Sequence, residues 1–266
     1  MTIDDKEMPL LSHLAELRSC LLRAVAAVLV LFICLLPVSN PLYSTLAKPL
    51  LSHLPENASM IATDVAAPFF APFKLTFFVA LFAAFPYVLY QLWRFIAPGL
   101  YQREKRFAIP LLASSVLLFY LGCAFAYFIV FPVAFAFFTS TAPEGVTVMT
   151  DISNYLDFVL SMFLAFGLAF EIPVAVVLLA WTGIVDPASL KRSRPYVIVG
   201  CFGVGAVFTP PDILSQFMLA VPMWILFEIG VLCARLGPGR DHDEESDAEA
   251  HTSDDSTPPS TTDHPQ

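Results

Sequence analysis

Long apolar stretches separated by short polar segments dominate the pattern of this 266-residue chain. An apolar stretch of about 20 residues has the length of a membrane-spanning helix, because roughly 30 Å of hydrocarbon must be crossed at about 1.5 Å per residue. The pattern predicts six such spans, over residues 19–37, 73–96, 107–138, 152–182, 195–208 and 213–232. We therefore expect an all-α polytopic membrane protein with a six-span domain over residues 19–235.

The start of this pattern and its fifth span differ from the rest. Residues 10–21 place Leu10, Leu14, Leu17 and Leu21 on one helical face. This predicts a cytoplasmic amphipathic lead-in over residues 1–18, lying at the membrane interface before the first span. The fifth span is only 14 residues long, or roughly 21 Å as a helix. That is shorter than a hydrocarbon core of about 30 Å.

The connection between the first two spans is rich in proline. Hydropathy falls from Val38 to Pro72, and we expect a structured outer loop there in which Asp64 caps a short helix. Proline also interrupts the spans themselves, because it lacks the N–H that a helix needs. Pro132 is expected to disturb the end of the third span.

Basic residues are concentrated at alternate ends of the predicted spans. The N-terminus, residues 97–108, residues 183–194 and the start of the tail hold most of the Lys and Arg, whereas the opposite loops hold Lys48, with Lys74 at a helix end. Cytoplasmic loops carry the excess of positive charge in membrane proteins. The distribution therefore predicts that both termini are cytoplasmic.

Composition supports this class and locates the acidity of the chain. Hydrophobic residues make up 57% and charged residues 14% of the sequence, a balance unsuited to a soluble domain. The net charge of −9 comes from residues 241–266, which hold nine acidic and no Lys or Arg residues. Residues 236–266 are thus expected to form a disordered acidic cytoplasmic tail. The neutral remainder gives no indication of nucleic-acid binding.

Signals of catalysis are absent from the sequence. It contains no zinc-protease, nucleophile-elbow, P-loop or dinucleotide motif. An intramembrane hydrolase would need a nucleophile and a base within the spans, and no such pair is visible. The five cysteines form no C-x-x-C pair and are interpreted as small buried hydrophobic residues. We expect no enzyme activity, no cofactor and no metal.

Two glutamates near the predicted cytoplasmic ends have two interpretations each. Glu16 has no Lys or Arg three or four positions away on its helix, where His13 and Ser12 precede it and Ser19 and Cys20 follow it. It is therefore either a solvated carboxylate or an acceptor for a partner's guanidinium. Glu104 lies among Arg103, Lys105 and Arg106, which favours local pairing. Only together do the two acids indicate a two-point acceptor for a basic peptide.

Glu171 lies inside the fourth span, where a charged side chain costs at least about 2–3 kcal/mol. Pro173 frees the carbonyl of Ala169, which predicts a kink beside Glu171. The side chain is either a protonated group bonded within the bundle or part of a wet cavity open to the cytoplasm. An alternative function follows from the second interpretation: a proton-coupled secondary transporter of a small solute, with Glu171 as the proton carrier.

An ordered set of motifs extends over about residues 10–235. It comprises His13-Leu-Ala-Glu-Leu-Arg18, Met60-Ile-Ala-Thr-Asp64, Pro68-Phe-Phe, Phe95-Ile-Ala-Pro98, Tyr101-Gln-Arg-Glu-Lys-Arg106, Phe119-Tyr120 with Phe125-Ala-Tyr-Phe128, Phe166-Gly-Leu-Ala-Phe-Glu-Ile-Pro173, Lys191-Arg-Ser-Arg-Pro-Tyr196 and Thr209-Pro-Pro-Asp212. This set resembles the TatC family, the polytopic receptor subunits of the twin-arginine translocase. The acidic tail lies outside the resemblance.

The resemblance implies a glove-like bundle of six helices whose concave face is lined by Glu171. It also implies that Glu16 and Glu104 bind twin-arginine signal peptides, with Arg18, Phe95 and Arg106 supporting the site. Matching outer positions needed for assembly or transport are Pro49, Phe69 and Asp212. Thr209 and Gln216 match a polar cluster that docks single-span partners.

The resemblance further implies the setting of the protein. Its partners would be the single-span subunits TatA and TatB, the signal peptides of folded cargo proteins, the lipid bilayer and other copies of itself. Its location would be the bacterial cytoplasmic (inner) membrane. The proton-motive force would drive the transport of folded proteins across this membrane.

Overall fold

Helices dominate the computed structural model, which describes residues 4–51, 60–96, 105–140, 150–181, 185, 187–208 and 213–235. They are α1 (Asp4–Leu35), α2 (Ser39–Leu51), α3 (Ala67–Ile96), α4 (Lys105–Phe125), α5 (Phe131–Ser140), α6 (Ile152–Ala169), α7 (Ile172–Trp181), α8 (Pro187–Arg192), α9 (Arg194–Phe208) and α10 (Ile213–Arg235). A 3₁₀ turn, η1 (Leu36–Val38), joins α1 to α2, and a π-helical turn, η3 (Ala126–Val130), joins α4 to α5.

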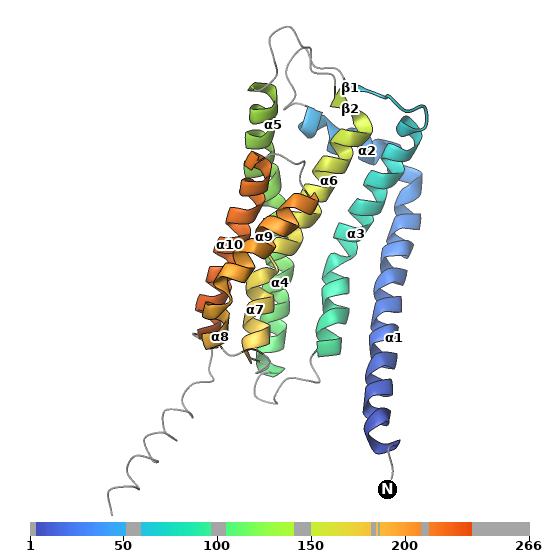
Figure 1. The fold of residues 1–266 in the computed structure, drawn as a ribbon. Helices are drawn as coiled ribbons and strands as arrows, with labels where there is room; N and C mark the ends of the chain where they lie inside the picture. Colours follow the sequence, from blue (N-terminus) through green and yellow to red (C-terminus); the bar gives the residue numbers. More distant parts are fainter. Residues whose placement is uncertain are drawn as a thin grey trace, which may run out of the picture.

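The long helices run alternately up and down the molecule as six passes (Figure 1). The passes are α1, α3, α4 with α5, α6 with α7, α9 and α10. Within the described residues five helical stretches are long and apolar enough to cross a membrane, and α9 is a shorter apolar helix. The expectation of an all-α polytopic fold is thus confirmed. The start of α1 and the end of α10 lie at the same end of the bundle.

The first part of the chain differs in detail from the expectation. The expected interfacial lead-in and the first span form one uninterrupted helix, α1. The expected loop after it contains a further helix, α2, with Pro41 in its first turn, where a missing N–H costs nothing. Asp64 caps no separate short helix. Its Oδ1 accepts a hydrogen bond from the N–H of Ala66, and α3 begins at Ala67, six residues before the expected start of the second span.

Two short segments far apart in the sequence pair at the end of the bundle near α2 (Figure 1). β1 (Met60–Ile61) and β2 (Thr150–Asp151) are parallel, with Met60 opposite Thr150 and Ile61 opposite Asp151. The sequence analysis did not predict this pair, because two-residue strands carry no periodic signal. It ties the segment before α3 to the start of α6.

Proline and polar residues interrupt the third and fourth passes where the sequence indicated. The π-helical turn η3 ends just before Pro132, which has no N–H to give to the helix. The fourth pass is interrupted at Phe170–Glu171, between α6 and α7, with Pro173 in the first turn of α7. The predicted kink beside Glu171 is confirmed as a break between two helices.

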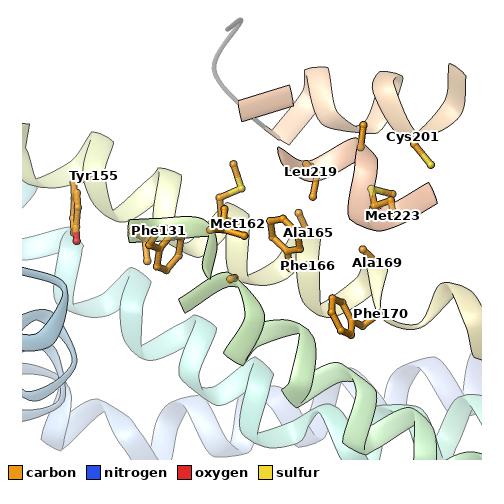
Figure 2. Packing of buried hydrophobic residues seen from close by; sticks show 14 residues of the cluster. Phe131, Tyr155, Met162, Ala165, Phe166, Ala169, Phe170, Cys201, Leu219 and Met223 are labelled. Carbon is orange, nitrogen blue, oxygen red and sulfur yellow. The ribbon is translucent and has the colours of Figure 1, made fainter. Parts of the chain in front are cut away.

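The buried core lies between the third, fourth, fifth and sixth passes. Its largest cluster joins Phe131 of α5, Met162 and Phe166 of α6, Cys201 of α9 and Leu219 of α10, as Figure 2 shows. Helices α4 and α6 approach closely, because a Cβ added at Gly122 would lie 2.5 Å from the Phe166 carbonyl oxygen. Small residues permit such close contacts in membrane bundles. The core thus fixes the second half of the chain as one unit.

Candidate functional site

Glu16 lies on α1, in the half of the helix nearer the N-terminus. Its side chain is exposed and forms no ion pair with any described residue. The neighbouring Ser19 donates its hydroxyl to the carbonyl of Ala15 at 3.0 Å and so does not compete for the carboxylate. Arg18 is exposed as well. The geometry therefore leaves Glu16 available to a cationic partner.

The other residues expected at this site lie near the junction of α3 and α4. Phe95 is half-buried in the last turn of α3, next to the exposed Arg94. Glu104 lies outside the described residues, and Arg106 belongs to α4 with its side chain outside them. Figure 1 places the end of α3, the start of α4 and the start of α1 at the same end of the bundle. This end is the candidate receptor face.

Glu171 is half-buried at the break between α6 and α7. The hydroxyl of Ser115, on α4, donates a hydrogen bond to its Oε2. Its Oε1 is buried and has no hydrogen-bond partner among the described residues. The sequence analysis did not single out Ser115, which is buried. The signal available in the sequence was a polar residue within an apolar stretch. One side of the carboxyl group is thus bonded within the bundle, and the other is left for a further donor.

Of the residues expected at the opposite end, Phe69 is the best described. It is 62% exposed and its ring contacts those of Phe70 and Phe73, with centroids 5.3 and 4.8 Å away. Pro49 is in α2 with its side chain outside the described residues. Asp212 and Thr209 lie outside them as well. Their expected roles remain predictions.

Gln216 joins α10 to α9. Its Nε2 donates to the carbonyl of Phe202 at 2.9 Å. Gly205 on α9 provides the room, because a Cβ there would lie 3.2 Å from Cγ of Gln216. The amide group that we expected to face a partner helix is therefore engaged within the chain. Gln216 sets the spacing of α9 and α10, on which any surface formed by the two helices depends.

Two ion pairs connect helices within the described part of the chain, and the sequence analysis did not predict them. Lys74 of α3 pairs with Asp157 of α6, and Arg194 of α9 pairs with Glu228 of α10 at 2.6 Å. The sequence analysis placed Lys74 at a helix end, whereas it is the eighth residue of α3 and pairs with another span. The sequence signal was the presence of charged residues within apolar spans, because such residues usually pair with one another.

Asp151 is the most heavily hydrogen-bonded carboxylate that the structure describes. Its Oδ2 accepts bonds from the N–H and hydroxyl of Thr63 at 2.9 and 2.6 Å, and its Oδ1 accepts from the N–H groups of Ser153 and Asn154. The hydroxyl of Thr63, followed by these N–H groups, lowers the pKa of Asp151 to about 2. Asp151 caps α6 and secures β1 to β2. An acidic residue directly before an apolar stretch was the sequence signal for the cap.

Comparison with known proteins shows the family to which the chain belongs. The sequence model of the family described as Sec-independent protein translocase protein (TatC) matches residues 12–222. The chain belongs to the TatC family. No group of three or more potential metal ligands occurs among the described residues of this TatC-family chain. Families of this kind are components of multi-subunit protein translocases and not enzymes.

Individual relatives cover nearly the whole chain. The TatC protein of Azotobacter chroococcum mcd 1 is 66% identical over 227 residues, 85% of this chain and 89% of the relative. That of Escherichia coli K12 is 55% identical over 246 residues, 92% of this chain and 95% of the relative. A crystal structure of the twin-arginine translocase receptor TatC matches with a TM-score of 0.76 at 38% identity, covering 84% and 98% of the two chains. The similarity thus includes both sequence and fold.

Proposed function

We propose that this chain is the core receptor subunit of a twin-arginine translocase and binds the signal peptides of folded cargo through Glu16 and Glu104. The observation that carries the proposal is the exposed carboxylate of Glu16, which forms no ion pair with any described residue. Glu16 lies in the half of α1 that begins at the end of the bundle where α3 ends and α4 begins. Membership of the TatC family supports it. The same membership favours protein translocation over the small-solute transporter considered from Glu171.

Two carboxylates suit a pair of arginines for a geometrical reason. Each guanidinium presents a planar fork of N–H donors that bonds both oxygens of one carboxylate, and an ammonium group lacks this fork. Glu16 and Glu104 would each take one arginine, with Arg18, Phe95 and Arg106 shaping the site around them. A peptide with two lysines is expected to bind much less tightly.

The setting of this receptor is part of the same proposal. The basic residues before α4 and around α8 would lie in the cytoplasm, which places both termini there and the β1–β2 pair on the outer side of the bacterial inner membrane. TatA and TatB would dock as single helices near Thr209 and Gln216. Pro49, Phe69 and Asp212 would contribute to assembly on the outer side, and the proton-motive force would supply the energy.

Binding of a twin-arginine signal peptide to the purified protein tests the receptor site. A charge-assisted hydrogen bond contributes about 1.5–3 kcal/mol, so Glu16→Ala and Glu104→Ala should each weaken binding about 10- to 100-fold. Glu228→Ala is a matched control, because that glutamate is already paired with Arg194. Its signal-peptide Kd should equal that of the wild type.

The outcomes separate the receptor from other functions. Equal binding by wild type and both glutamate variants would reject the two-carboxylate site. Equal binding of twin-lysine and twin-arginine peptides would reject recognition by guanidinium geometry. Uptake of small solutes by proteoliposomes containing this chain alone, abolished by Glu171→Gln, would support the transporter instead.

A further inference from the structure

Helix α3 changes direction part-way along its length (Figure 1). Pro86 lies within it and has no N–H, so the carbonyl of Phe82, one turn earlier, receives no helical hydrogen bond from position 86. In a membrane no water is at hand to satisfy such a carbonyl, and another group of the protein must do so. A proline of this kind makes a helix easier to bend at that point.

The donor that replaces the missing N–H comes from a different helix. The hydroxyl of Tyr120, on α4, donates to the carbonyl oxygen of Phe82 at 3.0 Å. The residue before it, Phe119, stacks on Phe85 with ring centroids 3.5 Å apart. Helix α4 therefore contacts α3 within the turn that precedes Pro86, through one polar and one aromatic contact.

Helix α4 is itself held firmly by α6. The ring of Phe119 is fully buried, and a Cβ added at Gly167 of α6 would lie 2.5 Å from it. One turn further along, Gly122 approaches the backbone of Phe166 just as closely. Because α4 has so little freedom against α6, a hydrogen bond from Tyr120 ties the flexible point of α3 to a fixed part of the bundle.

The direction of α3 beyond Pro86 determines where its last turn lies. Phe82 and Phe95 are thirteen positions apart, which corresponds to about 20 Å of helix at about 1.5 Å per residue. A change of about 10° at the bend would therefore move Phe95 by roughly 3 Å. Displacements of this size are comparable to the length of a hydrogen bond.

We propose that Tyr120 is a positioning residue for signal-peptide binding: its hydroxyl replaces the hydrogen bond lost at Pro86 and sets the direction of the half of α3 that carries Phe95. Tyr120 touches no peptide in this proposal, which rests on the proposed receptor function. The loss of the hydroxyl alone should loosen the bend while the ring packing is kept.

Spin labels measure the direction of α3 independently of peptide binding. Leu92→Cys on α3, beyond the bend, and Leu117→Cys on α4 are exposed sites for the two labels, in a background whose five native cysteines are replaced. In the full chain, Tyr120→Phe should broaden the distribution of distances between the two labels. Tyr87→Phe is the matched control, because Tyr87 has the same exposed fraction as Tyr120, 42%, and lies beside Pro86 without a hydroxyl hydrogen bond among the described residues. It should leave the distribution unchanged.

Binding of a twin-arginine peptide measures the consequence. An interhelical hydrogen bond in a membrane protein contributes about 3- to 20-fold to an equilibrium. Tyr120→Phe should weaken the binding by up to this factor. In a Pro86→Ala background, where position 86 regains its N–H, Tyr120→Phe should change neither the distance distribution nor the Kd.

Each result decides a separate point. An unchanged distance distribution in Tyr120→Phe overturns the proposal, and so does equal broadening in the Pro86→Ala background. Broadening without any change in Kd overturns the positioning role. If the wild type binds no twin-arginine peptide, the proposed receptor function fails, while the spin-label comparison still decides whether Tyr120 fixes the bend.

Discussion

Asp151 shows how much one exposed side chain contributes at the outer end of this bundle. Both of its oxygens accept hydrogen bonds, from Thr63 in one segment and from the first turn of α6 in another. Thr63 and Asp151 are 88 positions apart in the sequence. Because these bonds favour the ionised form, they connect the stability of this end of the molecule to pH.

Lowering the pH should weaken this connection. The pKa of Asp151 is about 2 in the folded chain and 3.8 ordinarily, so its contribution is fully present above about pH 4 and is lost as the pH falls through about 2. Thr63→Val removes one of the donors and should lower the Tm of the detergent-solubilised protein at pH 7, with a smaller effect at pH 3.

Thr45→Val is the control for this measurement. The hydroxyl of Thr45 donates only within α2, to the carbonyl of Pro41. The same change of side chain there should leave the difference between the Tm values at pH 7 and pH 3 as in the wild type. An equal loss for both threonine variants would show that Asp151 is not responsible.

At the scale of elements, α4 and α6 pack closely against each other at two glycines. Gly167 and Gly122 each face a neighbour at 2.5 Å from an added Cβ. Gly200 on α9 has nothing within 4 Å of that position. Gly167 and Gly200 are therefore both helical but have opposite surroundings. Comparing substitutions at the two positions separates the effect of packing on stability from the effect of the backbone.

Alanine should destabilise the protein at Gly167 but not at Gly200. Gly167→Ala inserts a methyl group against the buried ring of Phe119 and should destabilise the protein by about 1–3 kcal/mol. Gly200→Ala adds no contact and should leave stability unchanged or raise it by about 0.5–1 kcal/mol, because alanine favours the helix. Thermal unfolding in mild detergent compares the two variants. A loss of stability at Gly200 as large as that at Gly167 would contradict the close contact.

The sequence predicted the elements where apolar stretches were long and lacked a competing signal. The span expected over residues 195–208 is α9 within one residue, and that expected over residues 152–182 corresponds to α6 with α7. Helix α2 was missed because its prolines indicated a loop, although Pro41 stands in the first turn, where proline is tolerated. Local patterns do not show which position of a helix a proline will occupy.

The contacts between elements could not be predicted from the sequence, for a different reason. Lys74 and Asp157 are 83 positions apart, and Tyr120 and Phe82 are 38 apart. Nothing local to either residue selects its partner. At the receptor face, Glu16 was identified because no Lys or Arg lies three or four positions away on its own helix, which is a local property. Its pairing with Glu104 lies outside the described residues and stays a prediction.

For the whole molecule, the six alternating passes place the two ends of the bundle on opposite sides of a membrane. The start of α3 and helix α8 lie at opposite ends of the bundle. Val65, which precedes α3 and is 99% exposed, and Ser189, exposed on α8, are therefore suitable sites for labels. In intact cells a membrane-impermeant maleimide should label Val65→Cys from outside and Ser189→Cys only after permeabilisation. The reverse result would invert the proposed orientation.

The shortness of α9 has a consequence for the lipids around the protein. Its 15 residues extend about 22 Å, so the bilayer of about 30 Å must become thinner beside this helix. Each ångström of such hydrophobic mismatch costs a fraction of a kcal/mol. The acyl chains next to α9 are then already compressed before any cargo arrives, and this flank is where the membrane around the subunit is most easily deformed further.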